Sequence, residues 1–357
     1  MATNPLQSLP APALVFAGQA SRWQESLIEA ASNPDVALEL TTLLAAARKR
    51  TAPVGREIAI AAPGAGERLD ELLAGGDAPA SRPGDVRPAV SVPGIVLGQI
   101  AAHRELRELG LDLDGSTPLV GYSQGALGVL AASEPLEALS LAITLGAALS
   151  ATTAGGTDRR PRMLAVGGAT REFIEANRGD AALAVANGRR QATLSGSPEQ
   201  LADAQSRLET AAKEHNDALE ERLIGGSAIE LAIDPLPVAG AFHHPDSAAA
   251  AELTREWFAS AGFDAGARSA LVEEILVEPE DWPAKVRSLI ESGARDLVVL
   301  DRSLAKLTDP LVAGTGARVI DASTAEERDR LATPGQGPPE GETWERFAPR
   351  PATPPRG

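Results

Sequence analysis

The sequence contains no cysteine among its 357 residues, only four histidines and a single tyrosine. Without cysteine the chain can form no disulfide, no thiolate metal site and no cysteine nucleophile. This also suits a reducing compartment, so we expect the protein to be cytoplasmic. A serine nucleophile usually needs a base, and the only imidazoles available are His103, His215, His243 and His244.

Basic residues are scarce as well, because 33 Lys and Arg stand against 49 Asp and Glu, for a net charge of −16. That balance argues against a nucleic-acid partner, which would need a basic face. No apolar run reaches membrane-spanning length. Residues 1–12 lack the basic region and apolar core of a signal peptide. We therefore expect a soluble globular protein with no nucleic-acid or membrane partner and no bound metal.

One short motif suggests catalysis. Gly121-Tyr122-Ser123-Gln124-Gly125 follows an apolar run ending at Val120 and precedes a helix of small residues. This is the pattern of a nucleophile elbow, a sharp strand-to-helix turn that exposes a serine above a helix N-terminus. The glycines flank the turn because a Cβ there would collide with the neighbouring strand or helix. An ordinary glycine-rich turn would fit the same letters.

The predicted elements indicate an α/β protein with an inserted unit. Outside the insertion, short apolar runs predict strands at residues 14–16, 275–277, 297–300 and 318–320 and in the run that ends at Val120, separated by helices. The middle of the chain predicts two strand–helix–strand repeats: strands at 163–166, 182–186, 191–195 and 228–233, helices at 170–177 and from Pro198, and a hairpin turn at Asn187-Gly188. That β-α-β-β-α-β order is typical of a ferredoxin-like unit.

Four loops are expected to converge, because loops at the carboxyl ends of strands meet in one crevice. They contain Gln19, Ser91 to Pro93, Ser123 with Gln124, and His243 with His244. Catalysis by a serine nucleophile needs, besides the serine, a base that removes its proton and two donors for the developing oxyanion. Ser123 can supply the first, either histidine the second, and the backbone N–H groups of Gln124 and Gln19 the donors. A surface or capping role for the histidine pair is the competing interpretation.

Three motifs together resemble the acyl-carrier-protein acyltransferase family: Phe16-Ala17-Gly18-Gln19-Ala20, the Gly121–Gly125 motif, and Phe242-His243-His244-Pro245. The resemblance covers nearly the whole chain. It is strongest to the N-terminal acyltransferase domain of bacterial (actinobacterial) type I fatty acid synthase. That likeness rests on Ser91-Val92-Pro93-Gly94, Asn187-Gly188-Arg189-Arg190, Gly196-Ser197-Pro198-Glu199-Gln200-Leu201, Asp281-Trp282, Gly293-Ala294-Arg295 and the tail Trp344–Pro349.

The resemblance implies a fold and a domain arrangement. An α/β-hydrolase-like large subdomain would comprise residues 1–160 and 238–332. A ferredoxin-like small subdomain would comprise residues 161–237. Residues 333–357, rich in Pro and Gly, would form a linker toward a following domain, so that the chain is an excised part of a synthase.

The resemblance also implies an activity. Ser123 would be acylated from acyl-coenzyme A and would pass the acyl group to the phosphopantetheine thiol of acyl carrier protein. His243 would be the base, because it follows Phe242 as the family's histidine does, and Gln19 and Gln124 would form the oxyanion hole. The implied partners are acyl-coenzyme A, acyl carrier protein and the other synthase domains, with no bound cofactor.

Several positions depart from the family pattern. Tyr122 replaces the usual histidine, Ala20 replaces a glycine, and Asp301-Arg302-Ser303 stands near the usual Gly-Pro-Gly. Malonyl-selective members carry an arginine about two dozen residues after the serine, which pairs with the free carboxylate. Residues 144–149 contain no basic residue.

We therefore expect an uncharged short acyl group, acetyl first, loaded as the starter unit. The predicted substrate contacts are Ser91, Ala148, Asn187 and His244. A malonyl transacylase, a serine esterase and a non-catalytic scaffold domain remain as alternatives.

Overall fold

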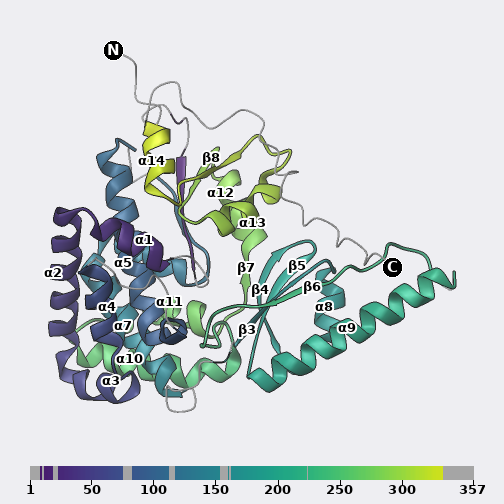
Figure 1. The fold of residues 1–357 in the computed structure, drawn as a ribbon, viewed down its shortest axis with the longest axis horizontal. Coiled ribbons are helices and arrows are strands. Elements are labelled where there is room, and N and C mark those ends of the chain that lie inside the picture. The colour runs from purple at the N-terminus through teal and green to yellow at the C-terminus, as the bar shows by residue number, and fades with distance from the viewer. Residues whose placement is uncertain are drawn as a thin grey trace, which may run out of the picture.

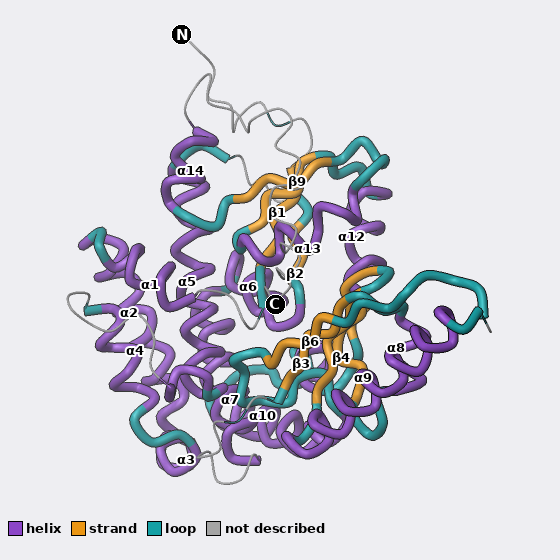
Figure 2. Tube along the Cα trace, turned by 45° about the vertical axis from the view of Figure 1, so that its right-hand side comes forward, coloured by secondary structure: helices purple, strands orange, loops and turns teal. Residues whose placement is uncertain are grey.

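The computed structural model describes residues 12–18, 23–74, 83–111, 117–152, 162–222 and 224–332, together with Leu9 and Arg160. Two β-sheets organise this part of the chain (Figures 1 and 2). A parallel sheet of order β2-β1-β8-β9 lies in the large subdomain. A sheet of order β6-β3-β5-β4-β7 lies in the small one. The predicted fold class, α/β-hydrolase-like with an inserted ferredoxin-like unit, is confirmed.

The large subdomain contains most of the helices. Its elements before the insertion are β1 (Pro12–Phe16), α1 (Trp23–Ala31), α2 (Pro34–Thr51), η2 (Ala52–Val54), α3 (Gly55–Ala61), α4 (Ala65–Leu73), η3 (Pro83–Val86), α5 (Pro88–Glu108), β2 (Leu119–Gly121), η4 (Ser123–Gly125), α6 (Ala126–Ser133) and α7 (Pro135–Thr152). After the insertion follow η6 (Pro245–Ser247), α10 (Ala248–Ser260), α11 (Ser269–Leu276), β7 (Glu280–Asp281), α12 (Trp282–Glu291), β8 (Asp296–Val299), α13 (Arg302–Val312), β9 (Arg318–Asp321) and α14 (Ala325–Ala332).

Strand β1 is central in the parallel sheet and is buried on both faces, which explains why its sequence is an unbroken apolar run. Ala13 and Val15 face one core, shared with α12 and α13. Leu14 and Phe16 face the other, shared with α5, α6 and α14. Parallel pairing places Phe16 beside Gly121. The carboxyl ends of β1 and β2 therefore bring residues 17–18 alongside Ser123.

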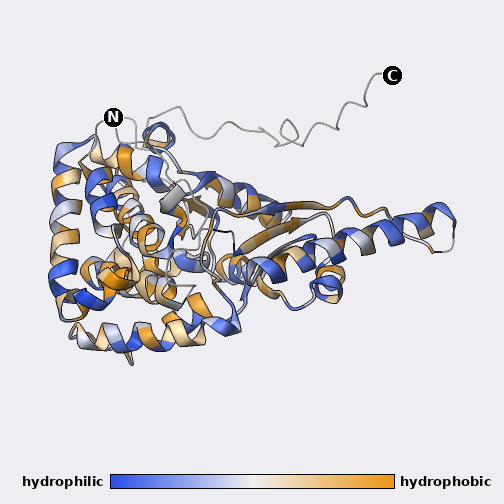
Figure 3. Ribbon diagram, turned by 60° about the horizontal axis from the view of Figure 1, so that its bottom comes forward, coloured by the Kyte–Doolittle hydropathy of each residue, from blue (hydrophilic) through white to orange (hydrophobic). Residues whose placement is uncertain are grey.

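The small subdomain is β3 (Met163–Gly167), α8 (Arg171–Asn177), β4 (Ala182–Gly188), β5 (Gln191–Ser195), α9 (Pro198–Glu220) and β6 (Ala232–Pro235). Its four own strands pair antiparallel. Helix α9 begins with a capping box between Ser197 and Gln200, and it buries Leu201, Ala204 and Leu208 against the sheet. The rest of α9 is largely hydrophilic where it extends away from the large subdomain (Figure 3).

A fifth strand joins the two subdomains. Strand β7 belongs in sequence to the large subdomain but pairs in parallel with β4, with Glu280 beside Val185 and Asp281 beside Ala186. In Figure 1 it lies where the two parts meet. The edge of the small sheet is thereby covered by a segment that continues directly into α12.

Several local predictions are wrong. Residues 275–277 do not form a strand, because Val272, Ile275 and Leu276 form one buried face of helix α11. Residues 91–93 are not a loop but lie inside α5, which begins at Pro88, a residue suited to a first helical position. A short apolar run does not distinguish strand from helix by itself.

The hairpin of the small subdomain is confirmed, with its turn displaced. Asn187 and Gly188 end strand β4, and the turn is formed by Arg189 and Arg190. Asn187 is buried, and its side chain is held by hydrogen bonds that a turn residue would not make. The last strand of the unit is also shorter and later than predicted, at Ala232–Pro235.

Helix α7 is long and apolar enough to cross a membrane by length and composition, contrary to the expectation that no such segment exists. However, 67% of it is buried inside the protein. It packs against α5, α6 and α10, as a core helix does. The predicted linker, residues 333–357, lies outside the described residues.

Candidate active site

Ser123 occupies a strained turn between β2 and α6. Its φ is +54°, in the left-handed region that costs a non-glycine residue about 1–3 kcal/mol. Space is equally restricted around it. A Cβ on Gly125 would lie 2.2 Å from the Phe16 carbonyl oxygen, and one on Gly121 would lie 2.1 Å from the Ala126 nitrogen. The motif therefore has the strand–turn–helix form of a nucleophile elbow.

His243 faces the serine hydroxyl. Ser123 Oγ and His243 Nε2 are 2.8 Å apart, although 120 residues separate them. His243 Nδ1 lies 2.8 Å from the Glu278 carbonyl oxygen. A carbonyl only accepts, so Nδ1 carries the proton and Nε2 is left to accept the proton of Ser123. Both side chains are almost completely buried. The pair has the geometry of a nucleophile and its oriented base.

Burial, helped by the nearby charge of Lys285 and opposed by the hydrogen bond to the Glu278 carbonyl, lowers the pKa of His243 to about 4. The imidazole must be neutral to accept a proton, so activity is expected to persist down to about pH 4 and to fall below it. The measurement is the pH profile of serine labelling by a fluorophosphonate, with circular dichroism showing at each pH that the protein stays folded. An acid limb near the ordinary histidine value of 6.5 would contradict a buried base.

Gln124 is fixed by its side chain, whose Nε2 donates to the Val92 carbonyl at 2.9 Å. Its backbone nitrogen lies beside Gly18, where an added Cβ would be 3.3 Å from that nitrogen and 2.9 Å from Ser123 Cβ. The amide of Gln99 donates to the Ala17 carbonyl and holds this strand end. Gln19, the predicted second oxyanion donor, lies outside the described residues, so its role stays a prediction.

Tyr122 has a structural explanation that the sequence did not offer. Its hydroxyl donates to Asn187 Oδ1 at 2.7 Å, and Asn187 Nδ2 donates to Thr193 at 2.9 Å. Its ring meets the ring of Trp282 edge-on, with centroids 5.3 Å apart. Burial raises the pKa of Tyr122, so the hydroxyl stays a neutral donor. The residue before the nucleophile therefore ties the elbow to the small subdomain.

Replacing Tyr122 by phenylalanine is expected to lower the free energy of unfolding by about 1–3 kcal/mol, because Asn187 Oδ1 loses its donor inside the protein. Urea denaturation of Tyr122→Phe, Asn187→Ala and the double variant measures the coupling. If the two losses simply add, the hydroxyl and the amide do not support each other across the subdomains.

The remaining predicted substrate contacts are used within the protein. His244 Nδ1 accepts from the Asp246 backbone at 3.1 Å and caps η6, and burial lowers its pKa. Ser91 Oγ donates to the Arg87 carbonyl at 3.2 Å inside α5. Ala148 is fully buried in an apolar cluster with Val54 and Trp257. The structure thus brings together Ser123, His243, Gln124 and, through Tyr122, Asn187, whereas it gives Ser91, His244 and Ala148 other contacts.

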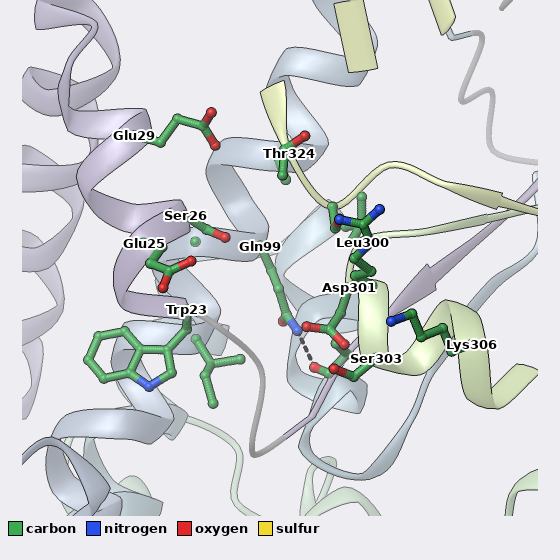
Figure 4. Close-up of a pocket in the computed structure, with 16 residues that line it drawn as sticks. Trp23, Glu25, Ser26, Glu29, Gln99, Leu300, Asp301, Ser303, Lys306 and Thr324 are labelled. Carbon is green, nitrogen blue, oxygen red and sulfur yellow. Dashed lines mark hydrogen bonds between the residues drawn. The ribbon is translucent and has the colours of Figure 1, made fainter. Parts of the chain in front are cut away.

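A cavity of about 550 Å³ opens beside this site at the carboxyl edge of the parallel sheet (Figure 4). Glu25 and Ser26 of α1 lie on one side of it, and Asp301 and Lys306 lie on the other. Ala17 lines it, but Ser123 and His243 are not among the described residues that do. Because neither reactive side chain reaches it, we do not assign acyl transfer to this cavity.

One segment of the site was missed by sequence reasoning. The five residues 278–282, which we call the clamp segment, contact both Ser123 and His243. The Glu278 carbonyl faces His243 Nδ1, and Glu280 Oε2 accepts the Ser123 backbone N–H at 2.8 Å. Acidic residues followed by a tryptophan mark the segment in the sequence. Ser123 lies 157 positions from Glu280, and His243 lies 35 positions from Glu278.

Comparisons with known proteins relate the chain to acyltransferases. Residues 161–235 match the family model of the fatty acid synthase central AT domain. Solved structures share the fold. They include MCAT from Mycobacterium tuberculosis, at 22% identity and a TM-score of 0.60 over 90% of this chain and 100% of that one. The malonyl CoA-acyl carrier protein transacylase of Coxiella burnetii aligns at 18% identity and a TM-score of 0.59, over 90% and 98%.

A third solved structure contains a type II polyketide synthase acyl-carrier protein in complex with its malonyl-transacylase. It aligns at 17% identity and a TM-score of 0.61 over 90% of this chain and 99% of that one. No curated protein sequence matches. At these identities the solved structures establish the fold, and the family model covers the small subdomain. The sequence resemblance and the comparisons therefore agree on the acyl-carrier-protein acyltransferases, at the level of fold.

Proposed function

We propose that the chain transfers a short acyl group from coenzyme A to the phosphopantetheine thiol of acyl carrier protein through an ester on Ser123. The observation that carries this proposal is the 2.8 Å contact between Ser123 Oγ and His243 Nε2 within a strained elbow. The comparisons support the carrier protein as acceptor, because one solved relative is a complex with such a protein.

In the first half-reaction Ser123 Oγ attacks the thioester carbonyl carbon while His243 Nε2 accepts the hydroxyl proton. The negative charge that develops on the carbonyl oxygen is stabilised by the backbone N–H of Gln124 and, as predicted from the sequence, by that of Gln19. The carbon–sulfur bond then breaks. His243 returns its proton to the departing coenzyme A thiolate, which leaves an acyl ester on Ser123.

In the second half-reaction the phosphopantetheine thiol gives its proton to His243 Nε2 and its sulfur attacks the ester carbon. The carbon–oxygen bond to Ser123 breaks, and the serine oxygen regains the proton from His243. A third acidic residue is not required, because the Glu278 carbonyl, 2.8 Å from Nδ1, supplies the orientation that an aspartate supplies in a triad.

Two acyl groups are candidates. The solved relatives named above include a malonyl CoA-acyl carrier protein transacylase, which favours malonyl. Arg162 lies close enough to His244 for its positive charge to add to the effect of burial in lowering the pKa of His244. A cation in this position also favours malonyl. Helix α7 contains no basic residue that could pair with a free carboxylate, which favours acetyl. We propose acetyl as the preferred group and starter loading within a type I fatty acid synthase as the setting.

The decisive experiment incubates the protein with radiolabelled acetyl- or malonyl-coenzyme A and then adds holo acyl carrier protein. A serine-linked label that moves to the carrier protein is expected. Absence of any serine-linked label would overturn the enzymatic proposal. Rapid loss of the label to water, with none on the carrier protein, would support an esterase instead.

A further inference from the structure

We infer that Glu280, held by Lys285, is a positioning residue that fixes the nucleophile elbow from the small subdomain's sheet. The inference rests on the proposed function and deepens it. It begins from the clamp segment, residues 278–282, whose first residue faces His243, whose third residue binds Ser123 and whose last packs on Tyr122. Both Ser123 and His243 are thus held by the same short stretch of chain.

The Ser123 backbone N–H has an unusual acceptor. The amide after a nucleophile serves the oxyanion, but the serine's own amide points away, and here it donates to Glu280 Oε2 at 2.8 Å. This hydrogen bond acts directly at the residue with φ +54°, a conformation that persists only when the surroundings over-determine it.

An ion pair holds this carboxylate in place. Lys285 Nζ lies 3.2 Å from Glu280 Oε2, and it also donates to the Gly121 carbonyl at 3.2 Å and to Glu274 at 2.7 Å. Burial alone would lower the pKa of Lys285, but Glu280 and Glu274 outweigh it and raise that pKa. The ammonium therefore stays charged. The buried Glu280 and the partly exposed Lys285 together hold the amide of the nucleophile and the carbonyl two residues before it.

Simple stabilisation explains Glu280 poorly. Its side chain is only 2% exposed, and Oε1 has no hydrogen-bond partner among the residues that the structure describes. A buried carboxylate with one unsatisfied oxygen is costly, and an apolar residue of similar size is often as stable or more so. Strand β7 places Glu280 on the edge of the small sheet, beside Val185 of β4, so the contact also sets the elbow against the second subdomain.

Two substitutions separate the position of the Glu280 side-chain oxygen from the charge of the side chain. Glu280→Gln removes the charge but keeps an oxygen where Oε2 lies, and its NH₂ group takes the place of the unpartnered Oε1. Glu280→Asp keeps the charge for Lys285 but withdraws the oxygen from Ser123 by one methylene. Glu274→Asp is the matched control, because Glu274 also binds Lys285 but has no hydrogen bond to Ser123 among the described residues.

The rate of Ser123 labelling by a fluorophosphonate probe is measured per reactive site, alongside the rate of acylation by acetyl-coenzyme A, its KM and the melting temperature. Glu280→Asp is expected to lower both rates by about a hundredfold, as a displacement of about 1 Å does, with KM unchanged. Glu280→Gln and Glu274→Asp are expected to stay within about threefold of wild type, because both keep the acceptor for the Ser123 amide.

Equal rates per reactive site in Glu280→Asp and wild type, with only the melting temperature lowered, would overturn the inference and leave a structural role. A slow Glu280→Gln would overturn it too, because charge and not position would then matter. The probe needs neither coenzyme A nor carrier protein. A wild type that labels at Ser123 but transfers nothing would sink the proposed function while the Asp–Gln contrast still decides this inference.

Discussion

Ser123→Ala is expected to abolish the acyl-enzyme and to lower kcat for transfer by at least about 10⁴-fold, the scale on which a nucleophile acting with its base contributes. His243→Ala should cost nearly as much. The two side chains are 2.8 Å apart and act as one unit, so the double variant should be little worse than either single variant. Single-turnover acylation by radiolabelled acetyl-coenzyme A, read as label on the protein, measures all three.

Ser91→Ala is the matched control for that series. Ser91 is another buried serine, but its hydroxyl bonds within α5, and we expect transfer close to the wild-type rate. Residual labelling of Ser123→Ala at the wild-type rate would place the nucleophile elsewhere. Losses in Ser123→Ala and His243→Ala that multiply in the double variant would show that the two residues do not work together, whatever their distance.

The reactive pair could be predicted from the sequence because each member lies in a short local pattern. The elbow needs glycine at 121 because a Cβ there would meet Ala126 in the same turn, and glycine at 125 because the turn packs against the end of the neighbouring strand at Phe16. Likewise, the period of buried residues in α9 predicts its covered face. Strand β1 was predicted because a central parallel strand is apolar throughout. These are properties of consecutive residues, and a sequence displays them directly.

The supports of that pair could not be predicted, because they are tertiary. Nothing near Tyr122 in the chain indicates that its partner is Asn187, which the sequence placed in a turn and the structure places at the end of β4. Glu280 and Lys285 read as ordinary charged residues of a surface helix start. Their role depends on the pairing of β7 with β4, which brings the clamp segment into contact with the elbow. Residues 91–93 were misassigned for the opposite reason, since a local proline signal was given more weight than the helix that contains it.

Acyl selectivity is the second large effect, and it separates the two candidate substrates. Burying the free carboxylate of a malonyl group against helix α7, which contains no basic residue, would cost several kcal/mol if no cation pairs with it, and each 1.4 kcal/mol is about a factor of ten. We therefore expect kcat/KM for malonyl-coenzyme A to be at least about a hundredfold below that for acetyl-coenzyme A. Competition between the two labelled donors for one carrier protein measures this ratio.

A ratio near one, or in favour of malonyl, would show that the chain follows its solved relatives and that a cation outside α7 receives the carboxylate. Arg162, whose charge reaches His244, is then the residue to replace. Arg162→Gln should depress malonyl transfer selectively and leave acetyl transfer unchanged, because only the malonyl group carries a carboxylate to pair with it. If the variant slows both donors equally, Arg162 supports the fold around His244 and does not read the acyl group. In that case the carboxylate must be received by a group other than Arg162.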